Sequence, residues 1–318
     1  MATTSTIGTT TTKGGIAEML SLCPLCAESS FKRLPTPGHW IGEDVFSAGE
    51  GVFGVCRCQS CSLSFINPRP TKDLLDAFYH GSTYVCHEAG SGDARASDFL
   101  LERVAHYGPY EGRRLLDFGC GGGFLLRGAT EAHWDAFGFD VGPRALASCR
   151  SQGLTVTDNL KDYSSSSFDV MFLNHVFEHI ADPPALLRTC RNLLRQSGKL
   201  FIAVPNLAGL RARLSLGFLS RNFNVDERCR AFPIHLFYFT PHTLKQMLEG
   251  NGLRVVAIET FGFGMEEFIN RPDSDVKEEV MAPSARKSQK DRGLKQIVKK
   301  AFFGAGLGEN LLAIACPK

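Results

Sequence analysis

A glycine-rich stretch that begins with a carboxylate is the clearest candidate for a ligand site. Asp117-Phe-Gly119-Cys120-Gly121-Gly-Gly123 follows an apolar run and precedes an amphipathic one. Glycines let the backbone turn tightly and approach a ligand, and the first turn of a helix has free N–H groups. A carboxylate there would repel a pyrophosphate, so Asp117 favours a ligand that carries an ammonium group and no phosphate. A turn with no ligand is the alternative.

A second carboxylate, Asp140, ends the next apolar run, about 20 residues after the glycines, where carboxylates accept hydrogen bonds from ribose hydroxyls. The alternative role is a favourable charge at the N-terminus of a helix that begins near Pro143.

Cysteines form the second candidate site. The chain has 11 cysteines, and Cys23-x2-Cys26 and Cys58-x2-Cys61 make two knuckles. Four thiolates form a closed tetrahedral zinc site, which stabilises a small module and leaves no open position for catalysis. The 31 residues between the knuckles exceed the usual spacing of about 15–20. Cys56 also makes a competing Cys-x-Cys pair, so a set of reduced, buried cysteines is the alternative.

Histidines provide the candidates for proton transfer. His175-Val-Phe-Glu178-His179 has the residue order of a zinc-protease motif, but it starts at the end of a predicted strand and Pro183 follows, so no long metal-binding helix is expected. We interpret Asn174 and His175 as lying beside the ligand of the glycine-rich stretch, and His179 as lying near the substrate entrance or hydrogen-bonded internally.

His235 lies in a segment that interrupts the alternation of strands and helices, and such segments often cover a substrate. A neutral imidazole there could take a proton from a hydroxyl or an activated carbon, although packing among the neighbouring aromatic residues is an equal alternative. His235 and His179 are the candidate catalytic residues. The same segment carries Leu207, Leu210, Leu214 and the run 216–219, which could form a lid, a homodimer surface or part of the core.

The elements that would position these residues are buried strands alternating with amphipathic helices. Strands are expected at 114–117, 136–140, 154–157, 168–173, 199–204, 253–259 and 310–315, and helices at 124–131, 144–152, 185–195 and 241–249. This alternation is typical of right-handed crossovers and predicts a doubly wound, mainly parallel α/β sheet.

Composition supports a soluble globular protein, because 43% of the 318 residues are hydrophobic and 21% are charged. The predicted organisation is a flexible leader (1–20), a zinc-binding module (21–70), a helical linker that covers the cofactor (71–112) and the α/β domain (113–318) with an insertion (206–240). The absence of a signal peptide or a long apolar run predicts a cytoplasmic protein without a membrane partner. The net charge of +2 does not favour nucleic acid, and the basic segment 286–300 is interpreted as a solvated face.

Several of these segments resemble class I S-adenosylmethionine-dependent methyltransferases. The resemblance includes Leu-Leu-Asp117-Phe-Gly-Cys-Gly-Gly-Gly, Asp140, the strand that starts at Phe168, Glu178-His-Ile-Ala-Asp-Pro183 and Pro233-Ile-His-Leu-Phe-Tyr-Phe-Thr-Pro241. The cysteine knuckles, followed by Leu63-Ser-Phe-Ile-Asn-Pro-Arg-Pro70 and by Phe78-Tyr79, are similar to the N-terminal zinc module of some bacterial methyltransferases, including sugar C-methyltransferases.

The resemblance implies a seven-stranded Rossmann-like methyltransferase fold with a small zinc-ribbon-like module, and S-adenosylmethionine as cofactor. Asp117 would lie near the amino group of the cofactor's methionine part, Asp140 at the ribose and the 158–160 turn near adenine. The residues expected to contact the cofactor are Asp117, Gly119, Cys120, Gly121, Gly123, Asp140, Val141, Asn159, Leu160, Asn174 and His175. The zinc ligands would be Cys23, Cys26, Cys58 and Cys61.

The resulting expectation is a transferase that moves a methyl group to the oxygen, carbon or nitrogen of a small molecule. The alternatives are an RNA methyltransferase that grips RNA with the zinc module and the basic segment, and a non-catalytic zinc-stapled binding protein. Quinone-biosynthesis and small-RNA O-methyltransferases use Glu-x-x-Glu-His in a divalent-metal site. His175 replaces the first glutamate, so we expect methyl transfer to survive removal of divalent metal other than the structural zinc.

Overall fold

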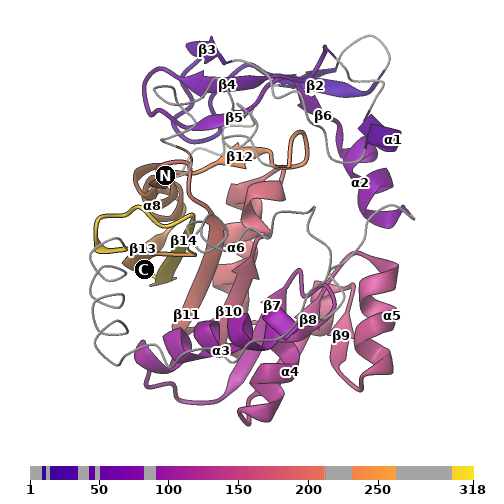
Figure 1. Ribbon diagram of the computed structural model, residues 1–318, viewed down its shortest axis with the longest axis vertical. Helices are drawn as coiled ribbons and strands as arrows, with labels where there is room; N and C mark the ends of the chain where they lie inside the picture. Colours follow the sequence, from indigo (N-terminus) through magenta and orange to yellow (C-terminus); the bar gives the residue numbers. More distant parts are fainter. Residues whose placement is uncertain are drawn as a thin grey trace, which may run out of the picture.

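A seven-stranded sheet forms the centre of the protein in the computed structural model, which describes residues 9–11, 15–34, 43–46, 51–81, 91–210, 212, 231–262 and 303–318. Its strand order is β13-β14-β11-β10-β7-β8-β9 (Figure 1). The neighbours from β11 to β9 pair in parallel, and β14 runs antiparallel to both β11 and β13. The predicted doubly wound, mainly parallel sheet is therefore confirmed.

The strands and helices of this domain lie close to their predicted positions. The strands are β7 (Arg114–Phe118), β8 (Asp135–Phe139), β9 (Thr155–Thr157), β10 (Phe168–Asn174), β11 (Leu194–Pro205), β13 (Leu253–Phe261) and β14 (Asn310–Pro317). The helices are α3 (Ser91–His106), α4 (Phe124–Glu131), α5 (Pro143–Ser151), α6 (Pro183–Leu193) and α8 (Pro241–Gly250), with short 3-10 turns η2 (Leu160–Asp162) and η3 (Phe177–His179). Asp182 accepts a hydrogen bond from Ala185 N (3.0 Å), and this N-cap makes α6 begin two residues before the expected position.

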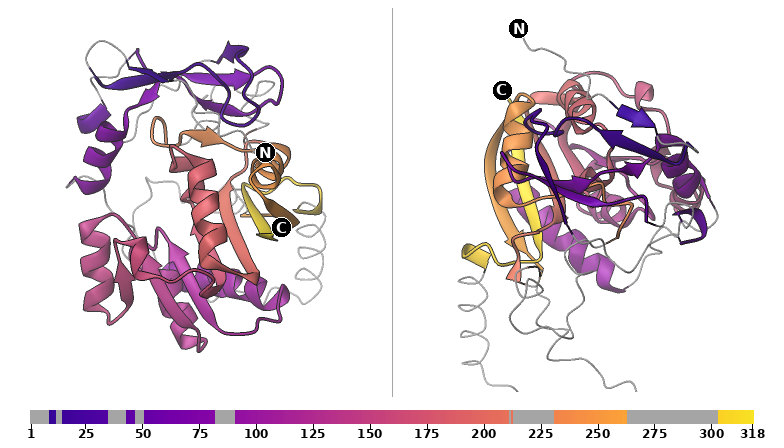
Figure 2. Two further views of the ribbon diagram at one scale, coloured as in Figure 1. Left: turned by 180° about the vertical axis from the view of Figure 1, so that it is seen from behind. Right: turned by 90° about the horizontal axis from the view of Figure 1, so that it is seen from above.

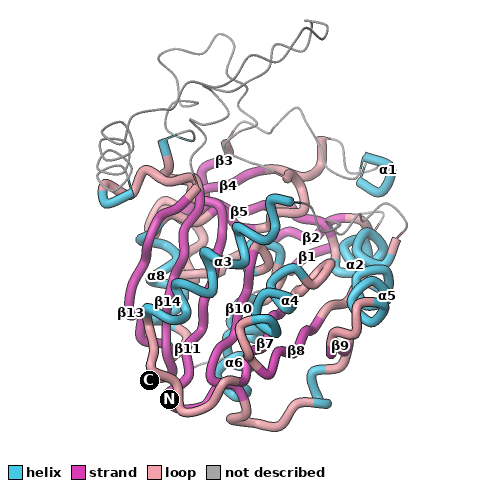
Figure 3. Tube along the Cα trace, turned by 60° about the horizontal axis from the view of Figure 1, so that its bottom comes forward, coloured by secondary structure: helices cyan, strands magenta, loops and turns pink. Residues whose placement is uncertain are grey.

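Alternating side chains cover the two faces of the large sheet, as the two-residue period of a strand requires. Leu115, Val170 and Phe172 pack with Leu100 of α3 and Leu125 of α4, which cross the near face in Figure 3. The opposite face packs against α6 and α8, through residues that include Leu116, Met171, Leu173, Leu187 and Leu244. Both faces of the central strands β7 and β10 are buried, which explains why these strands are mainly apolar runs in the sequence.

The N-terminal part contains two further sheets, seen at the top of Figure 1. One joins β1 (Thr9–Thr11), β2 (Ala17–Leu20) and β6 (Arg69–Pro70), and the other has the order β12-β5-β4-β3, with β3 (Phe31–Arg33), β4 (Val55–Cys58), β5 (Ser64–Ile66) and β12 (Phe237–Tyr238). The short helix α1 (Glu43–Phe46) and the amphipathic helix α2 (Lys72–His80) complete this part. The strands are too short to enclose a core, so the aromatic side chains of Phe46, Phe53 and Phe65 fill the space between these elements.

Two features differ from the domain boundaries expected from sequence. Residues 17–20 form a strand in which Ala17 and Leu20 are buried, so the ordered module begins before residue 21. The insertion at 206–240 does not form a separate unit throughout, because β12 joins the N-terminal sheet. The leucines from Leu214 to Leu219 and the basic segment 286–300 lie outside the described residues. Within the described chain, no helix has both the length and the apolar character needed to span a membrane.

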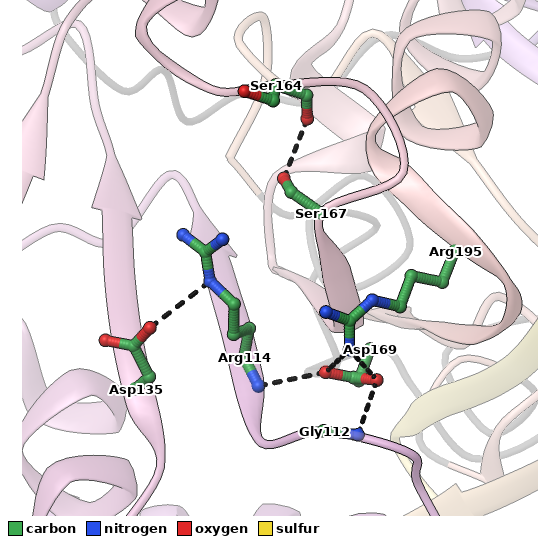
Figure 4. Close-up of polar contacts among 7 residues, drawn as sticks. All are labelled: Gly112, Arg114, Asp135, Ser164, Ser167, Asp169 and Arg195. Carbon is green, nitrogen blue, oxygen red and sulfur yellow. Dashed lines mark hydrogen bonds and ion pairs between the residues drawn. The ribbon is translucent and has the colours of Figure 1, made fainter.

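A buried carboxylate ties the start of the central strand to its neighbours. Asp169 of β10 accepts hydrogen bonds from Gly112 N and Arg114 N (3.1 Å each), and the Arg195 guanidinium lies 2.6 Å from its Oδ1 (Figure 4). Asp135 pairs with the side chain of Arg114 in the same region, but its side chain is 62% exposed. One buried aspartate therefore joins β7, β10 and β11 at the end of the sheet opposite the glycine loop.

We expect Asp169→Ala to lower the free energy of unfolding by about 2–4 kcal/mol, because two partly buried backbone amides and a partly buried arginine lose their acceptor. Asp135→Ala is the control, and it should cost less than about 1 kcal/mol because its ion pair is exposed. Urea unfolding measures both values. Equal losses in the two variants would contradict the anchoring role of Asp169.

Candidate functional site

The glycine loop lies at the carboxyl end of β7, where it turns into α4. Gly119 and Cys120 both donate backbone hydrogen bonds to Phe139 O, at 2.7 and 3.1 Å, which holds the loop against the end of β8. Gly119 has φ +78°, and a side chain there would collide with Val176. Gly121 has φ +49°, and open space lies where its side chain would be. The loop thus exposes its backbone on one side and allows close approach of a ligand.

Asp117 is buried at the end of β7, and its Oδ1 has no hydrogen-bond partner within the described part of the chain. Burial, reinforced by the charges of Asp140 and Cys149, raises the pKa of Asp117 to about 8. A buried hydrogen-bond acceptor without a partner lowers the free energy of unfolding. The ammonium group of a ligand would supply both the missing donor and the missing positive charge.

Asp140 lies beside the same loop and is also buried. Its Oδ2 accepts from Gly121 N (2.9 Å) and its Oδ1 from Gly142 N (2.7 Å). These bonds orient the carboxylate between the loop and the start of α5. Asp117 and Asp140 both lie at the edge of the sheet where ligands of open α/β folds bind.

The other residues expected at the cofactor have different surroundings. The side chain of Cys120 packs under the loop with Leu126 and Cys149, so only the backbone of Cys120 can face a ligand. Val141 is 44% exposed beside Asp140. Asn159 caps η2 by accepting from Lys161 N (3.2 Å), which places Leu160 in the first position of that turn.

A buried carboxylate surrounded by imidazoles lies after β10. Glu178 is fully buried in η3, and His175 Nδ1 and His235 Nε2 lie 3.4 and 3.8 Å from its Oε1. Burial alone would raise the pKa of Glu178, but His175, His179 and His235 outweigh burial and lower this pKa to about 2. Glu178 is therefore an anion at neutral pH.

The imidazoles of this cluster are held by backbone and side-chain contacts. His179 Nδ1 lies 3.1 Å from Ile234 O and 3.0 Å from the hydroxyl of Tyr79, and the His179 and His235 rings meet edge to face at 4.5 Å. Burial lowers the pKa of His179, although the charge of Glu178 acts in the opposite direction. His175 follows Asn174 at the strand end with φ +53° and 42% side-chain exposure, so it lies at the margin of the cluster.

Two groups in the described chain offer several metal-ligand atoms within 4.8 Å of one another. One is Glu178, His179 and His235. The order of residues in the sequence suggests His175, Glu178 and His179 as a set, but His235 takes the place of His175 in this group. The 3-10 form of η3 agrees with the expectation that this string does not build a long metal-binding helix.

The second group is Cys23, Cys26, Cys58 and Cys61. Cys23 Sγ lies 3.5 Å from Cys61 Sγ, and Cys26 Sγ lies 3.5 Å from Cys58 Sγ. Zinc–sulfur bonds of about 2.3 Å in a tetrahedron place sulfur atoms about 3.8 Å apart, so the four thiols fit a zinc ion. Burial would raise the pKa of Cys58, but the backbone N–H groups of Cys61 and Ser60 outweigh it and lower this pKa to about 7.

Sequence reasoning identified each of the histidines but missed two relationships. It gave Tyr79 no role, although the tyrosine approaches His179 from α2. It also did not pair Glu178 with His235, which lies 57 residues further along the chain. The 175–179 string suggests contacts only among its own residues, and no periodic pattern in the sequence connects it to residue 235.

Comparison with known proteins gives a consistent result. The methyltransferase domain family matches residues 92–258. The chain is 28% identical over 162 residues to a protein named ubiquinone biosynthesis O-methyltransferase from Methylococcus capsulatus, which covers 48% of this chain and 68% of that protein. A protein of the same name from Cereibacter sphaeroides is 36% identical over 107 residues, 31% of this chain and 43% of that protein.

A solved structure of a SAM dependent methyltransferase from Archaeoglobus fulgidus is 21% identical, with a TM-score of 0.47, over 77% of this chain and 98% of that one. The chain spans less than half of the Cereibacter relative, so these alignments concern the shared domain. Since the family match extends over more than half of the chain, the protein belongs to the methyltransferase domain family, as a class I S-adenosylmethionine-dependent member.

Proposed function

We propose that the protein transfers the methyl group of S-adenosylmethionine to a hydroxyl oxygen of a small phenolic molecule. The observation that carries this proposal is the buried Glu178 carboxylate with His235 beside it, since a hydroxyl must lose its proton when its oxygen is methylated. The aromatic rings around the histidines, among them Tyr79 and Tyr238, suit a flat acceptor. The names of the two relatives, both O-methyltransferases of ubiquinone biosynthesis, support an oxygen acceptor.

The cofactor would be held by the glycine loop and the two aspartates. Asp117 supplies the acceptor for an ammonium group, and Asp140 supplies a carboxylate for ribose hydroxyls. When bound, S-adenosylmethionine supplies a methyl group on a sulfonium, which needs no activation by the protein. The chain's own contribution is to hold the two reactants close together and to exclude water.

His235 would accept the proton of the acceptor hydroxyl, and Glu178 would stabilise the imidazolium that forms. The carboxylate is buried and anionic, so it favours a positive charge on the neighbouring ring. Ile234 O and Tyr79 fix the His179 ring through its Nδ1, and His179 would orient the acceptor through its other ring nitrogen, Nε2.

A divalent metal on Glu178, His179 and His235 is the second candidate for this step, favoured by the closeness of their ligand atoms. Such an ion would bind the acceptor oxygen and lower the pKa of its hydroxyl.

Substitution of Asp117 tests the cofactor side. Because the pKa of Asp117 is about 8 in the free protein, binding an ammonium group below that pH must release a proton. Affinity for S-adenosylmethionine should therefore rise by up to about tenfold per pH unit between about pH 5.5 and 7.5. Asp117→Asn should flatten this dependence and weaken binding by about 1.5–3 kcal/mol at pH 7.5, as measured by calorimetry.

Thermal unfolding of the free protein tests the raised pKa of Asp117 in a second way. Here stability should fall as the pH rises, whereas affinity for S-adenosylmethionine should rise. A raised pKa means that the folded state holds the proton of Asp117 more tightly, so this contribution to stability is lost as the pH rises through 8. Asp117→Asn should melt at a higher temperature than the wild type at pH 8.5. Identical pH dependence of binding in the two proteins would exclude Asp117 as the ammonium partner.

The acceptor side is tested with Glu178→Gln and His235→Gln. Each should lower kcat by about 10²–10⁴-fold toward a phenol, the usual contribution of a general base, while the affinity for S-adenosylmethionine changes little. His80→Gln, at an exposed position of α2, is the control and should keep full activity. Mass spectrometry of phenolic metabolite pools measures the transfer.

Chelator treatment distinguishes proton transfer to His235 from a divalent metal. Activity should persist at a chelator concentration that leaves the zinc content unchanged, as measured in parallel. If the wild type loses activity with chelator and regains it with added Mg²⁺, and the variants do not, a metal ion on Glu178, His179 and His235 activates the acceptor and His235 is not the base.

We also propose that Cys23, Cys26, Cys58 and Cys61 hold one structural zinc ion. Both knuckles have the same turn, in which the residue after the second cysteine adopts positive φ: Ala27 at +59° and Ser62 at +66°. Four sulfur ligands leave no position for a substrate, so the ion would organise the module of residues 17–70.

Elemental analysis should find one zinc per chain in protein purified without chelator. Cys58→Ser combined with Cys61→Ser should lose the metal, because two of four ligands are removed. Cys56→Ser should retain it, since Cys56 lies on the same strand but contacts Asn67 O (3.4 Å) and not the cluster. Metal retained equally by all three proteins would contradict this ligand set.

A further inference from the structure

The strand that follows His235 belongs to the sheet of the cysteine module. β12 pairs antiparallel with β5, with Phe237 opposite Phe65 and Tyr238 opposite Ser64. We call the sheet β12-β5-β4-β3 the module sheet. In Figures 1 and 2, β12 lies between the N-terminal strands and the large domain. The chain segment that carries His235 is therefore shared by the two parts of the molecule.

The peptide groups of Leu236 form the connection. Leu236 N donates to Glu178 O (2.8 Å), and Leu236 O accepts from Ile66 N (3.0 Å). Leu236 is itself buried, as are Ile66 and Glu178. One residue next to His235 thus links the backbone of the Glu178 turn to β5.

Two side chains from the N-terminal part of the chain reach the same turn. Tyr79 of α2 contacts His179 Nδ1 (3.0 Å), and Arg69 of β6 donates to Ala181 O (2.9 Å). Arg69 is held in turn by Glu18 of β2, at 2.6 Å, and is only 7% exposed. These contacts and the strand pairing converge on residues 178–181 and 234–238, which carry the acceptor-side histidines.

The cysteine cluster lies at the other end of the β4–β5 hairpin. Cys58 is the last residue of β4, and Cys61 precedes Ser62 in the turn that leads to β5. Cys58 N donates to Leu63 O (2.9 Å) and Ser62 N to Cys58 O (3.1 Å), so the turn is closed around the thiols. A metal ion would fasten this turn to Cys23 and Cys26 across the module.

We propose that the metal-bound cysteine cluster positions His235 and His179 against Glu178 through the module sheet. The inference rests on the proposed zinc ion and on the proposed role of the histidines. Cys58 and Cys61 are then positioning residues that act through β5 and Leu236. The glycine loop, Asp117 and Asp140 belong to the large sheet, so metal loss should disturb the acceptor side and leave the cofactor side unchanged.

Amide hydrogen exchange tests the coupling without depending on activity. We compare full-length wild type, the Cys58→Ser/Cys61→Ser double variant and the matched control Cys56→Ser. Exchange at the amides of Ile66 and Leu236 should accelerate by at least about tenfold in the double variant, while β10 and β11 keep their protection. Affinity for S-adenosylmethionine should stay within about twofold, because the sites are separate. Adding Zn²⁺ to chelator-stripped wild type should restore the slow exchange.

Turnover provides the second measurement. The double variant should lose at least about tenfold in kcat with a phenolic acceptor, with little change in KM for S-adenosylmethionine. Cys56→Ser should match the wild type in exchange and in turnover.

Unchanged exchange at Ile66 and Leu236 after metal loss would overturn the coupling. An equal acceleration in β10 and β11 with loss of cofactor binding would also overturn it, because the metal would then support the whole fold. Failure of the two underlying proposals would give different results. If the wild type contains no metal, the zinc assignment is wrong. If the wild type binds S-adenosylmethionine but methylates no phenol, the proposed acceptor is wrong.

Discussion

Asp117, Asp140 and Glu178 are buried carboxylates at the carboxyl edge of the sheet, and burial of charge is the constraint that shapes the site. Asp117 has negative neighbours, so its pKa is raised to about 8, whereas Glu178 has three imidazoles near it and its pKa is lowered to about 2. The same desolvation therefore has opposite results on the two sides of the site. The Asp117 side favours a cationic ligand, and the Glu178 side holds a buried carboxylate that favours a positive charge on a neighbouring ring.

These carboxylates also explain why each side depends on a different part of the fold. Asp117 and Asp140 follow neighbouring parallel strands, so the large sheet alone brings them together. Glu178 and His235 come from turns that the large sheet does not align by itself. Their arrangement uses the Leu236 peptide, β12 and the module sheet. The N-terminal part therefore helps to hold Glu178 and His235 together.

The sequence predicted the large sheet well because its signals are local. The helix expected at 124–131 coincides with α4, and the strand expected at 168–173 extends by one residue to Asn174. Apolar runs bounded by glycine, proline and capping residues determine such elements with little help from distant contacts. Asp117 and Asp140 could be assigned to a common edge for the same reason, since parallel strands that follow one another place their carboxyl ends together.

The acceptor side could not be predicted in this way, because its key pairings join residues far apart in the chain. β12 contains two residues and pairs with β5 more than 170 positions away, and a two-residue strand has no detectable period. The leader prediction was wrong for residues 17–20 because their burial depends on pairing with β6. A short strand is stable only when its partners are already in place. The closeness of Glu178 and His235 is thus a property of the assembled module and domain, and this is why the cysteine cluster and the histidines should respond to substitution together.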